Sequence, residues 1–132
     1  MPDPAELPAR LAAFVRDNVD SLEQLELLAL VMKAPDRWWD AASVAAELRM
    51  STGMARLALE GLATRNLMAI SLTTDIRYRF QPGTSTLRED CEAFAEAYRT
   101  NPVAMLRFVT DTQRRAIRDF ADAFRLRRHD DR

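Results

Sequence analysis

Six polar and basic residues in the middle of the chain have side chains that could contact the phosphates and base edges of a nucleic acid. Arginine forms bidentate hydrogen bonds with guanine and with phosphate oxygens, and serine and threonine hydroxyls donate to phosphates. Residues 51–82 carry four basic and two acidic side chains, a net charge of +2, which gives this stretch the positive bias that phosphate contacts require. The candidate DNA-contacting residues are Ser51, Thr52, Arg56, Arg65, Arg77 and Arg79.

The surroundings of these residues oppose nucleic-acid binding in two ways. The chain has a net charge of −1, and residues 1–50 hold five basic and nine acidic side chains, a net charge of −4, so no overall field attracts DNA. Glu60 would repel the DNA backbone. Leu57, flanked by Met54 and Ala58, would form a small apolar patch that suits a protein partner better than DNA. The arginines also fit the simpler interpretation of solvated side chains on an exposed face.

A helix pair followed by a β-hairpin is expected to position the six candidate residues. An Ala-rich helix over residues 40–49 has Asp40 as its N-cap, and a second helix runs from Thr52 to Arg65, capped by Ser51 or Thr52. The helix ends at Asn66, which suits the left-handed position there. Two strand-like runs follow at residues 67–72 and 76–80. In the second run, Ile76, Tyr78 and Phe80 alternate with arginines, as in a half-buried strand.

The second helix of this pair is amphipathic, and its periodicity predicts which side chains face solvent. Ala55, Leu59 and Leu62 recur at helical spacing and are expected to be buried. The outward face would then carry Thr52, Gly53, Arg56, Leu57, Glu60 and Thr64.

Residues 50–68, MSTGMARLALEGLATRNLM, resemble the DNA-reading helix and its exit in bacterial winged helix-turn-helix regulators of the ArsR and MarR type. The resemblance implies a mainly α fold with a small antiparallel β wing, extended by helices at both termini. It also implies a transcriptional regulator that binds duplex DNA as a homodimer. The alternative is a winged-helix protein interaction module that does not read DNA. The Cys and His clusters of metal-sensing ArsR proteins are absent from the sequence, so metal sensing is not implied.

Two helices are expected before this region. Apolar residues at three- and four-residue steps predict helices over residues 5–18 and 22–33, the second capped by Asp20. Of Trp38 and Trp39, one is expected to close the core and the other to lie at the surface, unless both serve in packing.

The C-terminal part is expected to be helical as well. Thr86 would cap a helix that runs to Arg99, and Pro102 would start another, with a bend near residues 110–113. The sequence therefore divides into a winged-helix domain, residues 1–82, and a C-terminal helical extension, residues 83–132.

Residues 116–128 form an amphipathic segment with an apolar side and a basic side. Such a helix packs on its own domain, pairs with a second copy, or lies in the groove of another protein, and the sequence leaves the three open. Its aspartates argue against a membrane surface. The candidate partner or dimer contacts are Leu57, Phe94, Tyr98, Ile117, Phe120 and Phe124.

The composition points away from catalysis and cofactor binding. Cys91 is the only cysteine and His129 the only histidine, so a Cys/His catalytic pair, a disulfide and a cysteine metal cage are not expected. With three glycines the chain has no Gly-rich phosphate loop. We expect no enzyme activity, cofactor or metal. The N-terminus lacks signal-peptide features and no apolar run is long enough to span a bilayer, which favours a cytoplasmic protein.

Overall fold

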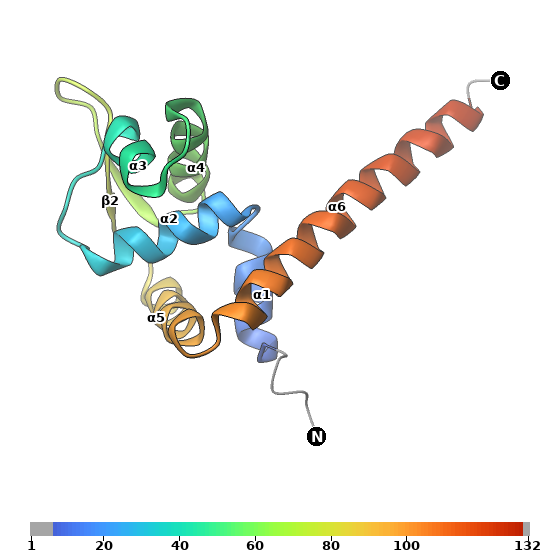
Figure 1. Ribbon diagram of the computed structural model, residues 1–132, viewed down its shortest axis with the longest axis horizontal. Coiled ribbons are helices and arrows are strands. Elements are labelled where there is room, and N and C mark those ends of the chain that lie inside the picture. Colours follow the sequence, from blue (N-terminus) through green and yellow to red (C-terminus); the bar gives the residue numbers. More distant parts are fainter. Residues whose placement is uncertain (1–6, 131–132) are drawn as a thin grey trace.

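The computed structural model describes residues 7–130 and the side chains of residues 7–125. It is mainly helical with one two-stranded antiparallel sheet, as the sequence predicted. The elements in order are α1 (Ala9–Asn18), α2 (Leu22–Lys33), α3 (Ala41–Leu48), α4 (Thr52–Thr64), β1 (Met68–Ser71), β2 (Arg77–Phe80), α5 (Ser85–Thr100) and α6 (Pro102–Asp130). In Figure 1, helices α1 to α5 and the hairpin lie together, and we call this part the body. The last helix, α6, projects from the body.

Local hydrogen bonds fix the ends of α3 and α4. Asp40 and Ser43 form a capping box at the start of α3, and the Ser51 hydroxyl accepts from the Met54 N–H at the start of α4. Arg49 ends α3 in the left-handed region with φ 54°, and Asn66 follows α4 with φ 66°. The predicted left-handed position of Asn66 is confirmed, and these caps hold α4 at a defined angle to α3.

The core lies where α4 packs against α2 and α3. Ala55, Leu59 and Leu62 are fully buried there, as predicted. Gly61 lets the backbones of α4 and α2 approach closely, because a Cβ at this position would collide with the side-chain amide of the buried Gln24. The Gln24 carbonyl oxygen in turn accepts from the Asp20 N–H at 2.8 Å, so this buried polar side chain is hydrogen-bonded.

The hairpin is tied to the segment that precedes α3. In the sheet, Met68 pairs with Phe80 and Ile70 with Tyr78. Tyr78 also exchanges two backbone hydrogen bonds of 2.7 Å with Trp39, which therefore forms a β-bridge on the other side of β2. Trp39 is buried, whereas Trp38 is 37% exposed, so one tryptophan closes the core and the other lies at the surface.

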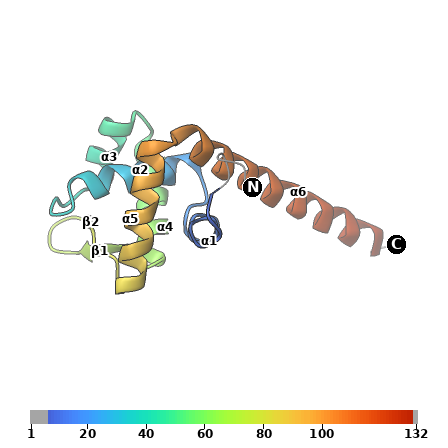
Figure 2. The ribbon, with the colours of Figure 1, turned by 90° about the horizontal axis from the view of Figure 1, so that it is seen from below.

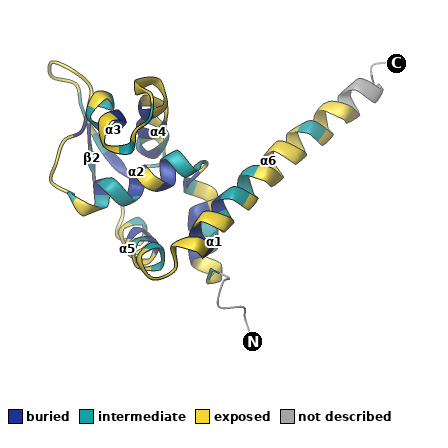
Figure 3. Ribbon diagram, in the orientation of Figure 1, coloured by how far each residue is buried: buried dark blue, intermediate teal, exposed yellow. Residues whose placement is uncertain are grey.

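The helix α6 begins in the body and leaves it. Ala104, Met105 and Val109 are buried in its first part, whereas Ile117, Phe120 and Phe124 are exposed further on. Figures 1 and 2, taken at right angles, both show the later turns of α6 extending away from every other element. In Figure 3 these turns are mostly coloured as exposed.

Four sequence predictions about the helices need correction. Ser21 caps α2 in place of Asp20, and Thr84 caps α5 in place of Thr86, because those hydroxyls reach the third N–H of each helix. The first helix begins at Ala9, and the expected residues 5 and 6 lie outside the described part. The bend near residues 110–113 is absent: α6 runs without interruption from Pro102 to Asp130, and the Thr112 hydroxyl donates to the Phe108 carbonyl at 2.8 Å within it.

Candidate nucleic-acid interface

The outward face of α4 carries the residues that the periodicity predicted. Thr52, Gly53, Arg56, Leu57, Glu60 and Thr64 are all exposed. The predicted apolar patch around Leu57 is smaller than expected, because Ala58 is 4% exposed and belongs to the core. Met54 and Leu57 remain, at 45% and 69% exposed.

Arg56 is the basic side chain in the middle of this face. Within the described residues its guanidinium makes no hydrogen bond or ion pair, so it is available to an external anion. Arg56 and Glu60 both lie close enough to Tyr78 to affect its pKa. Burial raises the pKa of the Tyr78 hydroxyl, Glu60 raises it further and Arg56 opposes them. Helix α4 therefore lies within electrostatic range of the buried Tyr78 of β2.

The hairpin presents two arginines from the same side of β2. The Arg77 guanidinium lies 3.0 Å from an Asp75 carboxylate oxygen, in an exposed pair. The Arg79 guanidinium lies 4.7 Å from the centre of the Trp38 ring and donates to Gln81 at 2.9 Å. The stacking holds Arg79 extended along the surface beside the hairpin.

Arg65, another predicted DNA contact, forms hydrogen bonds within the chain. Its guanidinium donates to the Asp20 carboxylate at 2.7 Å and to the Asn18 carbonyl at 3.4 Å, and its side chain is 28% exposed. These contacts tie the end of α4 to the connection between α1 and α2. The Arg65 donors are therefore directed at the chain's own oxygens.

Ser51 and Thr52 lie at the N-terminus of α4, on the exposed side. The Ser51 oxygen is occupied as the cap of Met54, but its own hydroxyl proton remains free to donate. Unpaired N–H groups at the start of a helix favour an anion at this position.

Three exposed apolar side chains of the hairpin were not expected from the sequence pattern. Ile70, Leu72 and Ile76 are 51%, 73% and 52% exposed. Ile76 was expected on the inner face of the second strand, but β2 begins one residue later, so Ile76 has no core beneath it. The strand pattern gave no signal for this, because only the position where pairing ends decides which apolar residues reach the core.

The predicted partner contacts divide into three groups. Phe94 is wrong as a surface residue: it is fully buried and packs against Phe14 and Tyr98, with ring centres 6.5 Å and 6.0 Å away. Tyr98 is half-buried and lines a cleft. Leu57, Ile117, Phe120 and Phe124 are exposed, so their role as partner contacts stays a prediction.

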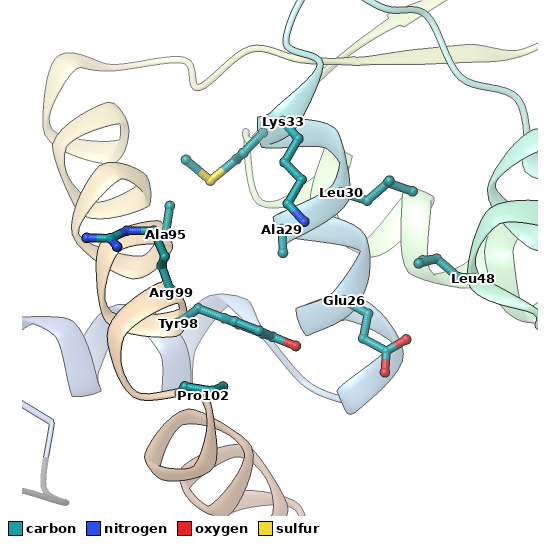
Figure 4. A pocket seen from close by; sticks show the side chains of 10 residues that line it. Glu26, Ala29, Leu30, Lys33, Leu48, Ala95, Tyr98, Arg99 and Pro102 are labelled. Atoms are coloured by element: carbon teal, nitrogen blue, oxygen red, sulfur yellow. The ribbon is translucent and has the colours of Figure 1, made fainter.

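The cleft lies between α2 and α5 and has a volume of about 680 Å³. In Figure 4 the Tyr98 ring extends from α5 towards α2, with Glu26 on the far side. Burial raises the pKa of the Tyr98 hydroxyl, and Glu26 adds to the effect. The lining of the cleft is mostly apolar and comprises Glu26, Ala29, Leu30, Met32, Lys33, Leu48, Ala95, Tyr98, Arg99 and Pro102.

Cys91 does not join any group that could bind a metal. It is fully buried, and burial raises the pKa of its thiol to about 12. Among the described residues no three His, Cys, Asp or Glu side chains gather as metal ligands would, and no helix has the length and apolarity to cross a bilayer.

No model of a known protein family matches this sequence, and no curated protein or solved structure is significantly similar to it.

Proposed function

We propose that the protein is a winged helix-turn-helix transcriptional regulator that binds duplex DNA as a homodimer in the cytoplasm. The observation that carries the proposal is the succession of α3, α4 and a two-stranded hairpin, with basic side chains on the outward face of α4 and on β2. Helix α4 is sealed on its apolar side and presents Arg56 outward. On β2, Arg77 lies close to Asp40 at the start of α3, and Arg79 lies over the Trp38 ring. The Trp39–Tyr78 bridge adds the short strand contact that links such a hairpin to the helix pair.

In this proposal α4 enters the major groove and the hairpin lies along the neighbouring backbone. Arg56 reaches a base edge or a phosphate, and Ser51 and Thr52 donate to phosphate at the start of the helix. Arg77 and Arg79 contact phosphates beside the groove. The Arg77–Asp75 pair is solvent-exposed and therefore contributes little, so Arg77 can exchange it for a phosphate.

The surface predicts weak binding by a single copy. Three arginines face DNA, and the acidic side chain of Glu60 lies on the same face of α4. Because each neutralised phosphate contributes about −0.9 to the slope of log affinity against log salt, six arginines in a dimer predict a slope of about −5.

A salt titration of binding to random duplex DNA tests the proposal. We expect the Arg77→Ala, Arg79→Ala double variant to weaken binding about equally for all sequences and to reduce the slope to about −2. Arg16→Ala is the matched control, because Arg16 is exposed on α1 and makes no ion pair within the described residues. Unchanged binding by the double variant, or no binding at low salt, would reject the proposal.

The second candidate function is a protein interaction module, and exposed apolar residues on the same surface favour it. Met54 and Leu57 on α4 offer an apolar contact that DNA does not need. Leu57→Asp should then abolish capture of the partner protein in a pull-down and leave the circular dichroism spectrum unchanged. Retained capture would count against this function.

A further inference from the structure

The helix α6 carries a second apolar stripe that the body does not cover. Its members recur alternately three and four residues apart, which is the spacing of a coiled-coil contact line. Val103, Leu106, Ile117, Phe120 and Phe124 are 56%, 36%, 70%, 75% and 57% exposed. We call this stripe the α6 seam, and it comprises Val103, Leu106, Thr110, Gln113, Ile117, Phe120 and Phe124.

The α6 seam is distinct from the side of α6 that packs on the body. The packed side carries Ala104, Met105 and Val109, which are buried. On a helical projection at 100° per residue, the seam lies to one side of these residues along the whole helix. In Figure 3 the body flanks only the first turns of α6. The chain itself therefore covers one side of α6 at its start and neither side at its end.

We propose that the α6 seam pairs with the same seam of a second copy in an antiparallel coiled coil. This inference specifies the homodimer named in the proposed function, but it does not depend on DNA binding. Antiparallel pairing lays the free half of each helix along the packed half of the other. The body of each copy then fixes the first half of its α6 in place, and the other copy's phenylalanines pack against that half.

The order of residues along the seam selects one register. In it, Val103 meets the partner's Phe120, Leu106 meets the partner's Ile117, and Thr110 meets the partner's Gln113. Apolar layers then flank a central polar layer in which the threonine hydroxyl and the glutamine amide can bond to each other.

Both neighbouring antiparallel registers are unfavourable. Shifting the pairing by one heptad in one direction opposes Thr110 to the partner's Phe120 and Gln113 to the partner's Ile117. Shifting it in the other direction opposes Thr110 to the partner's Leu106 and Gln113 to the partner's Val103. Each polar side chain would then be buried against an apolar one without a hydrogen-bond partner, which is costly.

The remaining seam residue also finds a surface in the selected register. Phe124 passes beyond the partner's Val103 to the junction of α5 and α6. Pro102 is exposed there and forms part of the wall of the cleft between α2 and α5. The second copy therefore offers an apolar contact to every apolar residue of the seam.

The area is adequate for a dimer. A phenylalanine side chain buries about 150–250 Å², so Phe120 and Phe124, at 75% and 57% exposed, leave roughly 250 Å² of ring surface open in each copy. The seam spans about 33 Å of helix. Two such seams, with the flanking side chains, approach the roughly 1,200 Å² at which specific interfaces begin.

A row of arginines flanks the seam and predicts how salt acts on the dimer. Arg107, Arg114, Arg118 and Arg125 lie along one edge of the seam at helical spacing. In the antiparallel pair, Arg107 and Arg114 of the two copies approach each other, so salt should screen a repulsion. Raising the salt concentration should therefore strengthen the dimer, whereas it weakens DNA binding.

Sedimentation of the full chain over a concentration series tests the pairing. We expect a concentration-dependent dimer, and Phe120→Asp should raise its dissociation constant on the order of 100-fold or more, because both copies lose a buried ring. Arg115→Asp is the control, since it places the same carboxylate five residues earlier, on the side of α6 away from the seam. A monomer at all concentrations, or a dimer that resists Phe120→Asp while the helical content is unchanged, would overturn the inference.

Cysteine cross-linking tests the direction of pairing. The double variant Leu106→Cys, Ile117→Cys should form disulfide-linked dimers, whereas Leu106→Cys alone should not. Cys91 is buried and stays out of the reaction. Cross-linking by Leu106→Cys alone would indicate parallel helices and overturn the proposed arrangement. A dimer with this behaviour that fails to bind DNA would instead reject only the proposed function.

Discussion

Helix α4 and the second half of α6 are both amphipathic, yet only one has its apolar side covered. In α4, Ala55, Leu59 and Leu62 are sealed against α2 and α3. In α6, Ile117 and Phe120 are at least 70% exposed. The contrast shows that periodicity predicts that a helix has an apolar side but does not predict what packs on that side.

The cause of the difference lies in the neighbours of each helix. Short connections and local caps return the chain so that α2, α3 and the hairpin surround α4. Nothing in the described part of the chain follows α6 to cover it. A helix with few tertiary contacts derives little stability from packing, so its apolar side is the place where a second molecule can contribute.

The largest effect on the free energy of unfolding is expected at Leu59, on the covered side of α4. Leu59→Ala leaves a cavity at a fully buried position and should lower the free energy of unfolding by about 2–5 kcal/mol. Leu57→Ala, two residues earlier on the exposed side of the same helix, should change it by less than about 0.5 kcal/mol. Equal effects of the two variants in urea denaturation would contradict the orientation of α4.

The ionisation of the Cys91 thiol reports how well the body excludes water from its interior. Burial raises the pKa of its thiol from 9.0 to about 12, so the unfolded chain ionises before the folded chain does. The resulting contribution to stability is complete below pH 9 and is lost as the pH rises towards 12. Burial also raises the pKa values of Tyr78 and Tyr98, so they add to the loss.

Unfolding curves between pH 8 and pH 11 measure this contribution. The wild type should lose more stability over this range than Cys91→Ala, which retains only the tyrosine contribution. A thiol reagent at pH 8 should modify Cys91 slowly until denaturant is added. Rapid modification of the folded chain would show an open body instead.

A smaller effect is expected at the cap that sets α3 beside α4. The Ser43 N–H donates to the Asp40 carboxylate at 2.7 Å and lowers the pKa of that carboxyl. Asp40→Ala should cost about 1 kcal/mol at pH 7. The contribution of the charge is present above pH 3.8 and is lost as the pH falls through the lowered pKa.

Asp40→Asn separates the cap from its charge. It should keep most of the stability at pH 7, because asparagine caps a helix as well as aspartate does. It should also unfold with a weaker acid dependence than the wild type. Identical acid denaturation curves for the two proteins would rule out the assigned role of the carboxylate.

The smallest effect on the free energy of unfolding is expected at Phe120, on the uncovered part of α6. At concentrations below dimer formation, Phe120→Ala should change the free energy of unfolding by less than about 0.5 kcal/mol, because Phe120 is 75% exposed in the single chain. A destabilisation that matches the one at Leu59 would mean that α6 folds back onto its own body.

Much of the fold could be predicted from local patterns. The bounds of α2, the left-handed Asn66 and the buried side of α4 follow from periodicity and capping chemistry, which act within a few residues. The caps Ser21 and Thr84 were assigned one or two residues away from their true positions. Several nearby polar residues suited each cap, and the sequence alone does not choose between them.

The candidate site was less predictable. Arg56 faces solvent as its spacing requires, but Arg65 reaches Asp20, a residue 45 positions earlier in the chain. Phe94 shares the helical spacing of an interface residue and is buried because α1 brings Phe14 against it. Such contacts depend on how distant segments meet, which no local pattern encodes.

The sequence by itself determined where the helices and strands lie and which side of each helix is apolar, because backbone hydrogen bonding and side-chain periodicity are local. Only the tertiary structure decided which of those apolar sides the chain covers itself. It packed the apolar side of α4 against α2, α3 and the hairpin and left the end of α6 without neighbours, since burial requires surfaces that meet across long stretches of sequence.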